Sequence, residues 1–170
     1  MEIKDKYEEK VNLKDILGIF ENGFKPFEEQ KVGVEFERLP ISSKDFKMVN
    51  YSGENGVYDL LRNFAKLDGW EYITDDYNII GLKKDEDMIN LEPGCQIELS
   101  FAPEKNIFDI KNKIDGFNKK INPILRKYDI NLLEYGISPV STYKHINLIP
   151  KKRYRIMADY LWGILSDVMM

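Results

Sequence analysis

Two acidic stretches of the chain have the residue types and the spacing of a divalent-cation site. In the first, Gly33, Glu35 and Glu37 alternate with apolar residues, which is the pattern of a β-strand with one face in a core. Every second side chain of a strand leaves the same face, so Glu35 and Glu37 share a face with Cα atoms about 6.8 Å apart. Hard ions such as Mg²⁺ take oxygen ligands and often share their shell with substrate phosphates. We therefore expect this strand to carry metal-ligating carboxylates, with Gly33 leaving room for a ligand.

The second stretch runs from Ile89 to Phe101. Treated as one extended strand, it places Glu92, Gln96 and Glu98 on one side, with Cys95 and the apolar residues on the other. The polar side carries acids and an amide but no lysine or arginine, which indicates a positive ligand. Pairing this side with the polar side of the first strand would gather three carboxylates and an amide.

Glu92 needs a further condition to join this cluster. In a straight strand it would lie about 20 Å from Glu98. We expect Pro93 and Gly94 to bend the strand, so that Glu92 joins the site or binds a second ion. The alternative for both stretches is a solvated acidic face without a ligand, because Glu-x-Glu is a common strand pattern.

A cationic segment, Pro150–Arg155, complements the acids. It lies at the N-terminus of a predicted helix, and helix N-termini attract anions. Arg153 is suited to bidentate contacts with a carboxylate or a phosphate. The alternative is a basic patch in solvent, with Tyr154 as a core residue. Cys95 lies on the apolar side of its strand, which predicts a buried and inert thiol.

The composition excludes several classes of function. The 170 residues are 43% hydrophobic, which suits one domain with a real core, and a net charge of −4 with a pI near 5.2 gives no basic footprint for nucleic acid. No apolar run approaches a membrane span, and the charged start has no signal-peptide core. A single cysteine, Cys95, and a single histidine, His145, leave no internal disulfide and no multi-histidine zinc site. These features favour a cytoplasmic protein without nucleic-acid or membrane partners.

The hydrophobic periodicity predicts an α+β domain over residues 1–170, with a mainly antiparallel sheet and helices packed on one face. Helices are expected at 12–23, 55–67, 106–128 and from about 154, and strands at 31–41, 70–74, 79–83, 89–101 and 130–137. Pro123 should kink or split the third helix. An incomplete sheet leaves an open edge, which favours a homo-oligomer or a complementing chain.

Three motifs, taken together, resemble a known enzyme family. They are VGVEFE at 32–37, LEPGCQIELS at 91–100 and PKKRYRIM at 150–157. In order and spacing they resemble the G-x-E-x-E, L-E-P-G-G-Q-x-E-L-S and P-K-G-R-Y-x-I-M motifs in the N-terminal part of glutamate–cysteine ligases of the plant and proteobacterial type. Cys95 and Lys152 stand where that pattern has glycine.

The resemblance implies part of a glutamine-synthetase-like catalytic domain, whose acidic sheet face holds Mg²⁺ or Mn²⁺ and ATP. It implies that the γ-carboxylate of glutamate is activated as an acyl phosphate, which the amine of cysteine or of another acceptor then attacks, as in glutathione biosynthesis. By position, the metal ligands would be Glu35, Glu37, Glu92 and Glu98. The residues facing the amino-acid substrates would be Gln96, Arg153 and Tyr154, with Arg153 also catalytic.

Members of that family continue well beyond the third motif. The resemblance therefore implies that residues 1–170 are the N-terminal part of a larger ligase, and it leaves the activity of this chain by itself open. One hypothesis is a ligase, present here as a truncated, split or degenerate form, whose active site is completed by further chain or by a partner. The other is a non-catalytic or split module, derived from such a ligase, that binds a metal or an amino acid without turnover.

Overall fold

The computed structural model describes residues 11–168, without the side chains of Tyr143 and of residues 162–168. The charged start at 1–7 and the end of the expected last helix at 169–170 lie outside the described residues. The chain divides into two compact units, residues 1–31 and 32–170, which are described separately. The expectation of a single domain over 1–170 stays a prediction.

The first unit contains helix α1 (Leu13–Gly23) and the short helix η1 (Phe27–Glu29). α1 begins where the sequence predicts it, with a capping box: Asn12 Oδ1 accepts from the backbone N–H of Asp15 at 3.1 Å, and the Asp15 carboxylate accepts from the N–H of Asn12 at 3.0 Å. Neither helix has a buried residue. The start of α1 is therefore fixed by the hydrogen bonds of its cap, and no buried side chain of the helix contributes.

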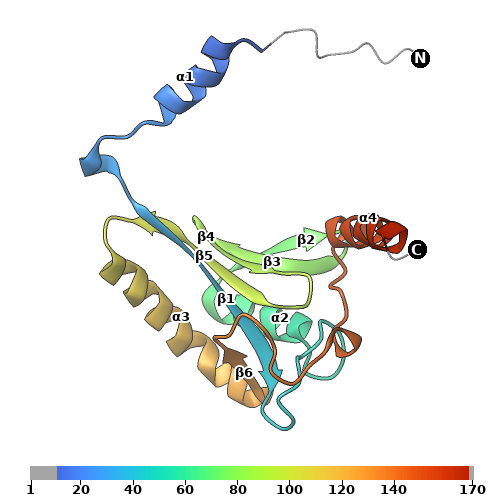
Figure 1. Cartoon of the computed structure of the whole chain (residues 1–170). Helices are drawn as coiled ribbons and strands as arrows, with labels where there is room; N and C mark the ends of the chain where they lie inside the picture. The colour runs from blue at the N-terminus through green and yellow to red at the C-terminus, as the bar shows by residue number, and fades with distance from the viewer. Residues whose placement is uncertain (1–10, 169–170) are drawn as a thin grey trace. The chain divides into compact units, whose positions relative to one another are not determined.

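The second unit is built on a six-stranded sheet with the order β2-β3-β4-β5-β1-β6 (Figure 1). Its strands are β1 (Val32–Ser42), β2 (Glu71–Asp75), β3 (Asn78–Lys84), β4 (Asp87–Leu91), β5 (Ile97–Glu104) and β6 (Ile130–Leu133). Its helices are α2 (Val57–Asp68), α3 (Ile107–Lys127), η2 (Tyr143–His145) and α4 (Lys152–Val168). Each neighbouring pair of strands is antiparallel, which confirms the predicted α+β class.

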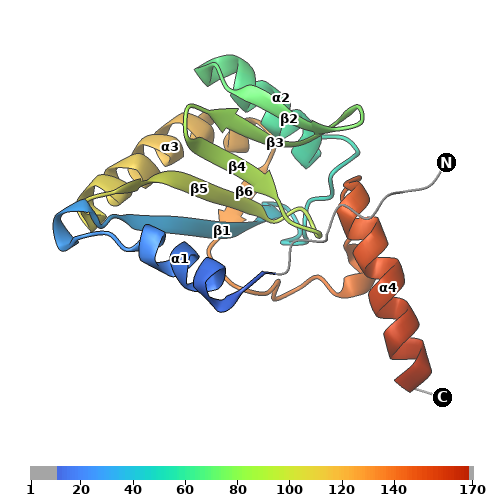
Figure 2. The same ribbon diagram turned by 90° about the horizontal axis from the view of Figure 1, so that it is seen from above.

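Helices α2 and α3 cover one face of this sheet (Figure 2). The core lies between them and the apolar sides of the central strands, where Leu82, Ile89 and Leu99 are fully buried against Phe64 and Ile121 of the helices. Burial of apolar surface is the main stabilising force for such a layer. It leaves the polar sides of the same strands on the opposite face of the sheet.

The expectation of one bent strand over 89–101 is wrong. β4 and β5 form an antiparallel hairpin in which Leu91 pairs with Ile97. The intervening turn is closed by hydrogen bonds from the N–H of Glu92 to the carbonyl of Gln96 and from the N–H of Cys95 to the carbonyl of Glu92, both 2.9 Å long. Pro-Gly is a strong turn signal, and here it reverses the chain instead of bending it.

Two further expectations change in detail. Helix α3 runs without interruption through Pro123, so the proline does not split it. The buried residues Phe117, Ile121 and Leu125 hold both halves of the helix on the core, which offsets the hydrogen bond that proline cannot donate. Strand β6 has four residues and is shorter than predicted. Within residues 11–168, no helix has the length and apolarity that a bilayer crossing requires.

Candidate functional site

Polar side chains of neighbouring strands share the sheet face opposite α2 and α3. The strand register places Glu37 of β1 beside Glu98 of β5, and Glu98 beside Asn90 of β4. One step along the strands, Glu35 lies beside Ser100. The two acidic stretches predicted to pair therefore do pair, with their acids on one face.

Glu98 lies at the centre of this acidic face. Its Oε1 accepts hydrogen bonds from Asn90 Nδ2 at 3.3 Å and from Ser100 Oγ at 3.2 Å. These two donors, one on its own strand and one on the neighbouring strand, fix the direction of the carboxylate. Sequence reasoning did not single out Asn90 or Ser100 as site residues; their signal was the same alternation that placed Glu98.

Glu37 shows how close the acids of the face are. Burial raises the pKa of Glu37, and the negative charges of Glu92 and Glu98 raise it further, while a hydrogen bond from Gln96 acts in the opposite direction. The hairpin explains this proximity, since it brings Glu92 back towards Glu98 instead of leaving it about 20 Å away. Glu35, two residues before Glu37 on β1, does not belong to the cluster of Glu37, Glu92 and Glu98.

The acids do not form a complete metal cage by themselves. In the described part of the chain, no group of three or more histidine, cysteine, aspartate or glutamate side chains is placed to hold a metal ion. Mg²⁺ is commonly bound through one or two carboxylates together with substrate phosphates and water. An all-oxygen acidic face of this kind fits an exchangeable, partly hydrated ion, whose water ligands nucleotide phosphates can replace, better than a resident structural ion.

Neutralising Glu37 is expected to stabilise the protein in the absence of divalent metal. A carboxylate with a raised folded-state pKa costs stability when it is charged in both states, and this cost disappears below its ordinary pKa. Because Glu37 is only partly desolvated and its side chain remains exposed to solvent, we expect Glu37→Gln to raise the free energy of unfolding by only about 0.5 kcal/mol at pH 7, and not at pH 3.5. Urea unfolding with a chelator checks this; a loss of stability at pH 7 would contradict the acid cluster.

The turn between β4 and β5 is built around Gly94 and Gln96. Gln96 Oε1 accepts a 2.8 Å hydrogen bond from the N–H of Gly94. A Cβ at Gly94 would lie 2.8 Å from Ile146 Cγ2 and 2.9 Å from Gln96 Oε1, so a larger residue here would displace these side chains. The N–H of Ile149 also donates to the carbonyl of Pro93 at 3.0 Å, which ties the turn to the segment before α4.

Tyr154, near the start of α4, connects the cationic segment to the acids. Its side chain is 3% exposed, and its hydroxyl lies 3.1 Å from Glu92 Oε2 and 3.4 Å from the carbonyl of Leu91, to which it can donate. It accepts from Arg153 Nη2 at 3.2 Å and from Lys151 Nζ at 3.5 Å. Burial raises the pKa of Tyr154; hydrogen bonding by Arg153 lowers it, and Glu92 raises it.

Two cations contact the ring of the same tyrosine. Lys151 Nζ lies 4.7 Å and Arg153 Cζ 5.0 Å from the centre of the Tyr154 ring, within the range of cation–π attraction. Lys151 was not predicted as a site residue, although it belongs to the basic run that was. Helix α4 is anchored at this end because the N–H of Lys152 donates to Asp75 Oδ2 at 2.7 Å.

Cys95 occupies the turn in a left-handed conformation, with φ +71°. Such a conformation favours glycine, which is the residue that the resembling motif has at this position. The side chain is completely buried, and burial raises the pKa of the thiol to about 12. The predicted burial of Cys95 is confirmed, and its lack of reactivity stays a prediction.

We expect Cys95 to resist thiol reagents while the protein is folded. A thiol with a pKa near 12 has about a thousandfold less thiolate at pH 8 than an ordinary cysteine, and only the thiolate reacts. Labelling by a chromogenic disulfide reagent should therefore be at least about 100-fold slower in buffer than in 8 M urea. Equal rates in the two solvents would show that the turn opens readily.

Comparison with known proteins gives one consistent result. Residues 31–169 match the family model of glutamate-cysteine ligase family 2. Similar proteins are glutamate–cysteine ligase B, chloroplastic, of Oryza sativa subsp. japonica (28% identical) and glutamate–cysteine ligase, chloroplastic, of Solanum lycopersicum (29% identical), both over 153 residues. These matches cover 90% of this chain but only 30% and 29% of the two relatives. The chain thus spans less than a third of the length of the curated relatives it matches.

The expected cytoplasmic location is contradicted by these relatives, which are all named chloroplastic. The physical reason for the error is that a single cysteine is compatible with every thiol-reducing compartment and does not distinguish one from another.

Proposed function

Because the chain belongs to the glutamate-cysteine ligase family 2, we propose that it contributes the acidic strands of an ATP-dependent ligase. The proposed reaction joins the γ-carboxylate of glutamate to the amine of cysteine through a γ-glutamyl phosphate. The observation that carries the proposal is the cluster of acids on one sheet face, where Glu37 pairs with Glu98 in the strand register, and where burial and then the charges of Glu92 and Glu98 raise the pKa of Glu37. Such a cluster is relieved when a cation binds.

In this proposal the acidic face binds the divalent ion that accompanies ATP. Glu98 and its register partner Glu37 supply ligands to this ion, and Glu92 in the turn and Glu35 further along β1 are proposed to supply ligands to further ions. When bound, Mg²⁺ or Mn²⁺ would neutralise phosphate charge and polarise the transferred group. The hydrogen bonds from Asn90 and Ser100 support this role, because they hold the Glu98 carboxylate in one orientation.

The cationic segment is proposed to face the amino-acid substrates. Arg153 would contact a substrate carboxylate or the phosphate as its charge develops, in a bidentate arrangement. The Tyr154 hydroxyl supports this role because it accepts from Arg153 and reaches Glu92, which fixes Arg153 next to the acidic face. Gln96 is proposed to orient a substrate from the turn, where the Gly94 N–H already holds its amide.

We further propose that residues 32–168 are one part of a larger catalytic sheet, since the relatives are more than three times as long as the matched region. β2 and β6, the outer strands in the described part of the chain, are where further strands or a second chain would pair.

The test is ADP release by the protein, alone and mixed with the part of the rice relative that this chain does not match. The proposal predicts ADP only when glutamate, cysteine and Mg²⁺ are all present, and γ-glutamylcysteine as the product. ADP release that ignores glutamate would contradict it. Mg²⁺ binding without ADP release in either preparation would instead support the second candidate, a binding module derived from such a ligase.

A further inference from the structure

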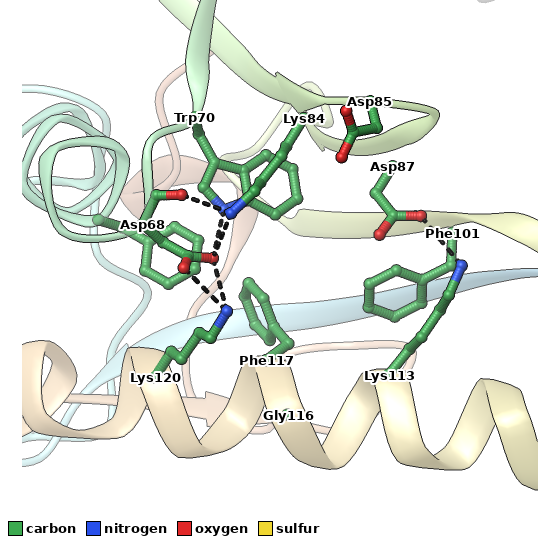
Figure 3. A pocket seen from close by; sticks show the side chains of 11 residues that line it. Asp68, Trp70, Lys84, Asp85, Asp87, Phe101, Lys113, Gly116, Phe117 and Lys120 are labelled. Carbon is green, nitrogen blue, oxygen red and sulfur yellow. Dashed lines mark hydrogen bonds and ion pairs between the residues drawn. The ribbon is translucent and has the colours of Figure 1, made fainter.

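A pocket lies between helices α2 and α3 and the face of the sheet that they cover, and Figure 3 shows the side chains that line it. It has a volume of about 240 Å³ and is bounded by α2, α3, the β3–β4 turn and β5. Aromatic side chains form its floor, among them Trp70, Phe101 and Phe117. Nothing in the proposed ligase reaction uses this pocket.

Charge is distributed unevenly along the pocket. At one end Asp68 pairs with two lysines, Lys84 at 3.4 Å and Lys120 at 2.8 Å. Two cations therefore share one carboxylate, and this end has an excess of positive charge. Burial raises the pKa of Asp68, but hydrogen bonds and charge from its partners lower it overall, so the carboxylate stays ionised at neutral pH.

The other end has the opposite excess. Lys113 is shared between Asp87 at 3.4 Å and Glu104 at 2.7 Å. Asp85 also lines this end, and within the described residues it forms no ion pair. Lys113 and Lys120 lie two helical turns apart on α3, so the lysines that pair with Asp87 and with Asp68 start about 10.5 Å apart along the helix axis.

Gly116 lies in the wall of the pocket, in the middle of α3. A Cβ added there would meet no atom within 4 Å, so packing inside the protein does not require glycine. Glycine in a helix interior costs about 0.5–1 kcal/mol relative to alanine. The missing side chain leaves space that belongs to the pocket. A bound ligand would therefore explain the glycine, whereas packing within the protein does not.

We propose that this pocket binds a small zwitterion with an apolar body, of the size of a dipeptide. The ammonium group would lie near Asp85 and Asp87, the carboxylate near Lys84 and Lys120, and an apolar side chain over the aromatic floor. A free amino acid carries its two charges on one carbon and cannot serve both ends. Two extended residues span about 7 Å, and a hydrogen bond of about 2.9 Å at each end extends this reach to about 12.8 Å, so a slightly bent dipeptide can contact both ends.

Trp70 provides a direct readout, because the chain has only two tryptophans. In a Trp162→Phe background, titration with glycyl-L-phenylalanine should change the fluorescence of Trp70 saturably below about 5 mM, an ordinary affinity for a ligand this small. The N-acetylated and the C-amidated dipeptides should each bind at least about tenfold more weakly, because each loses one charge-assisted contact. Equal binding of the blocked forms, or no saturation, would overturn the proposal.

Gly116→Leu is the variant that fills the pocket, and it should abolish the fluorescence change. Asn112→Leu introduces the same side chain on an exposed part of α3, and it should leave binding unchanged. Asp85→Asn, in the exposed β3–β4 turn, should weaken the free dipeptide about tenfold and should leave the N-acetylated form unaffected. Retained binding in both Gly116→Leu and Asp85→Asn would place the dipeptide elsewhere and overturn the proposal.

Discussion

Replacing Glu98 by glutamine is expected to lower glutamate-dependent ADP release at least about 100-fold. Glutamine has nearly the same shape and keeps an oxygen that can accept from Asn90 and Ser100, so the hairpin should remain intact. What it removes is the central negative charge of the acidic face, between Glu37 on β1 and Asn90 on β4. The loss should appear in turnover and in the Mg²⁺ dependence more than in stability.

The matched control for this variant is Glu86→Gln. Glu86 is an exposed acid in the β3–β4 turn, and its replacement changes the net charge by the same amount. It should leave ADP release within about twofold of the unmodified protein, since exposed charges away from a site contribute little. An equal loss in both variants would mean that overall charge, and not the acidic face, controls the reaction.

Replacing Tyr154 by alanine is expected to cost about 3–5 kcal/mol of unfolding free energy, the usual range for truncating a buried aromatic side chain. The ring is 3% exposed and is contacted by both Lys151 and Arg153. Its removal leaves a cavity beside the β4–β5 turn and leaves Glu92 without its hydroxyl partner. Urea unfolding monitored by circular dichroism measures this loss.

Tyr154→Phe separates the ring from the hydroxyl. It keeps the contacts of the ring and should cost only about 1 kcal/mol, the usual net value of one hydrogen bond. Because the hydroxyl also holds Arg153 near Glu92, we expect this variant to raise the KM for glutamate at least about fivefold while it remains folded. A glutamate KM that does not change would mean that Arg153 acts without the tyrosine.

The sequence pattern was sufficient to predict the pairing of the two acidic stretches. When polar and apolar residues alternate along a strand, the alternation determines on which face of the sheet each side chain lies. Both acidic stretches alternate clearly. The alternation placed Glu37 and Glu98 on one face, and the register puts them side by side. The cap of α1 and the amphipathic face of α2 were equally local signals.

Features that depend on chain reversal or on distant partners were not predictable in the same way. Pro93 and Gly94 are compatible with both a bend and a turn, and the choice depends on the pairing of β4 with β5. The contacts of Tyr154 with Glu92 join residues 62 positions apart, which no periodicity reveals. The zwitterion pocket is assembled from several elements, and its only local signal was a glycine inside a helix.

Binding of Mn²⁺ to the protein, measured by electron paramagnetic resonance of the free ion, tests the central claim most directly. It requires neither substrate nor a complementing chain. The account predicts that Mn²⁺ binds, that Glu98→Gln weakens the affinity at least about tenfold, and that Glu86→Gln does not change it. Binding that is the same in all three proteins, or absent from all of them, would contradict the assignment of the acidic face as the metal site.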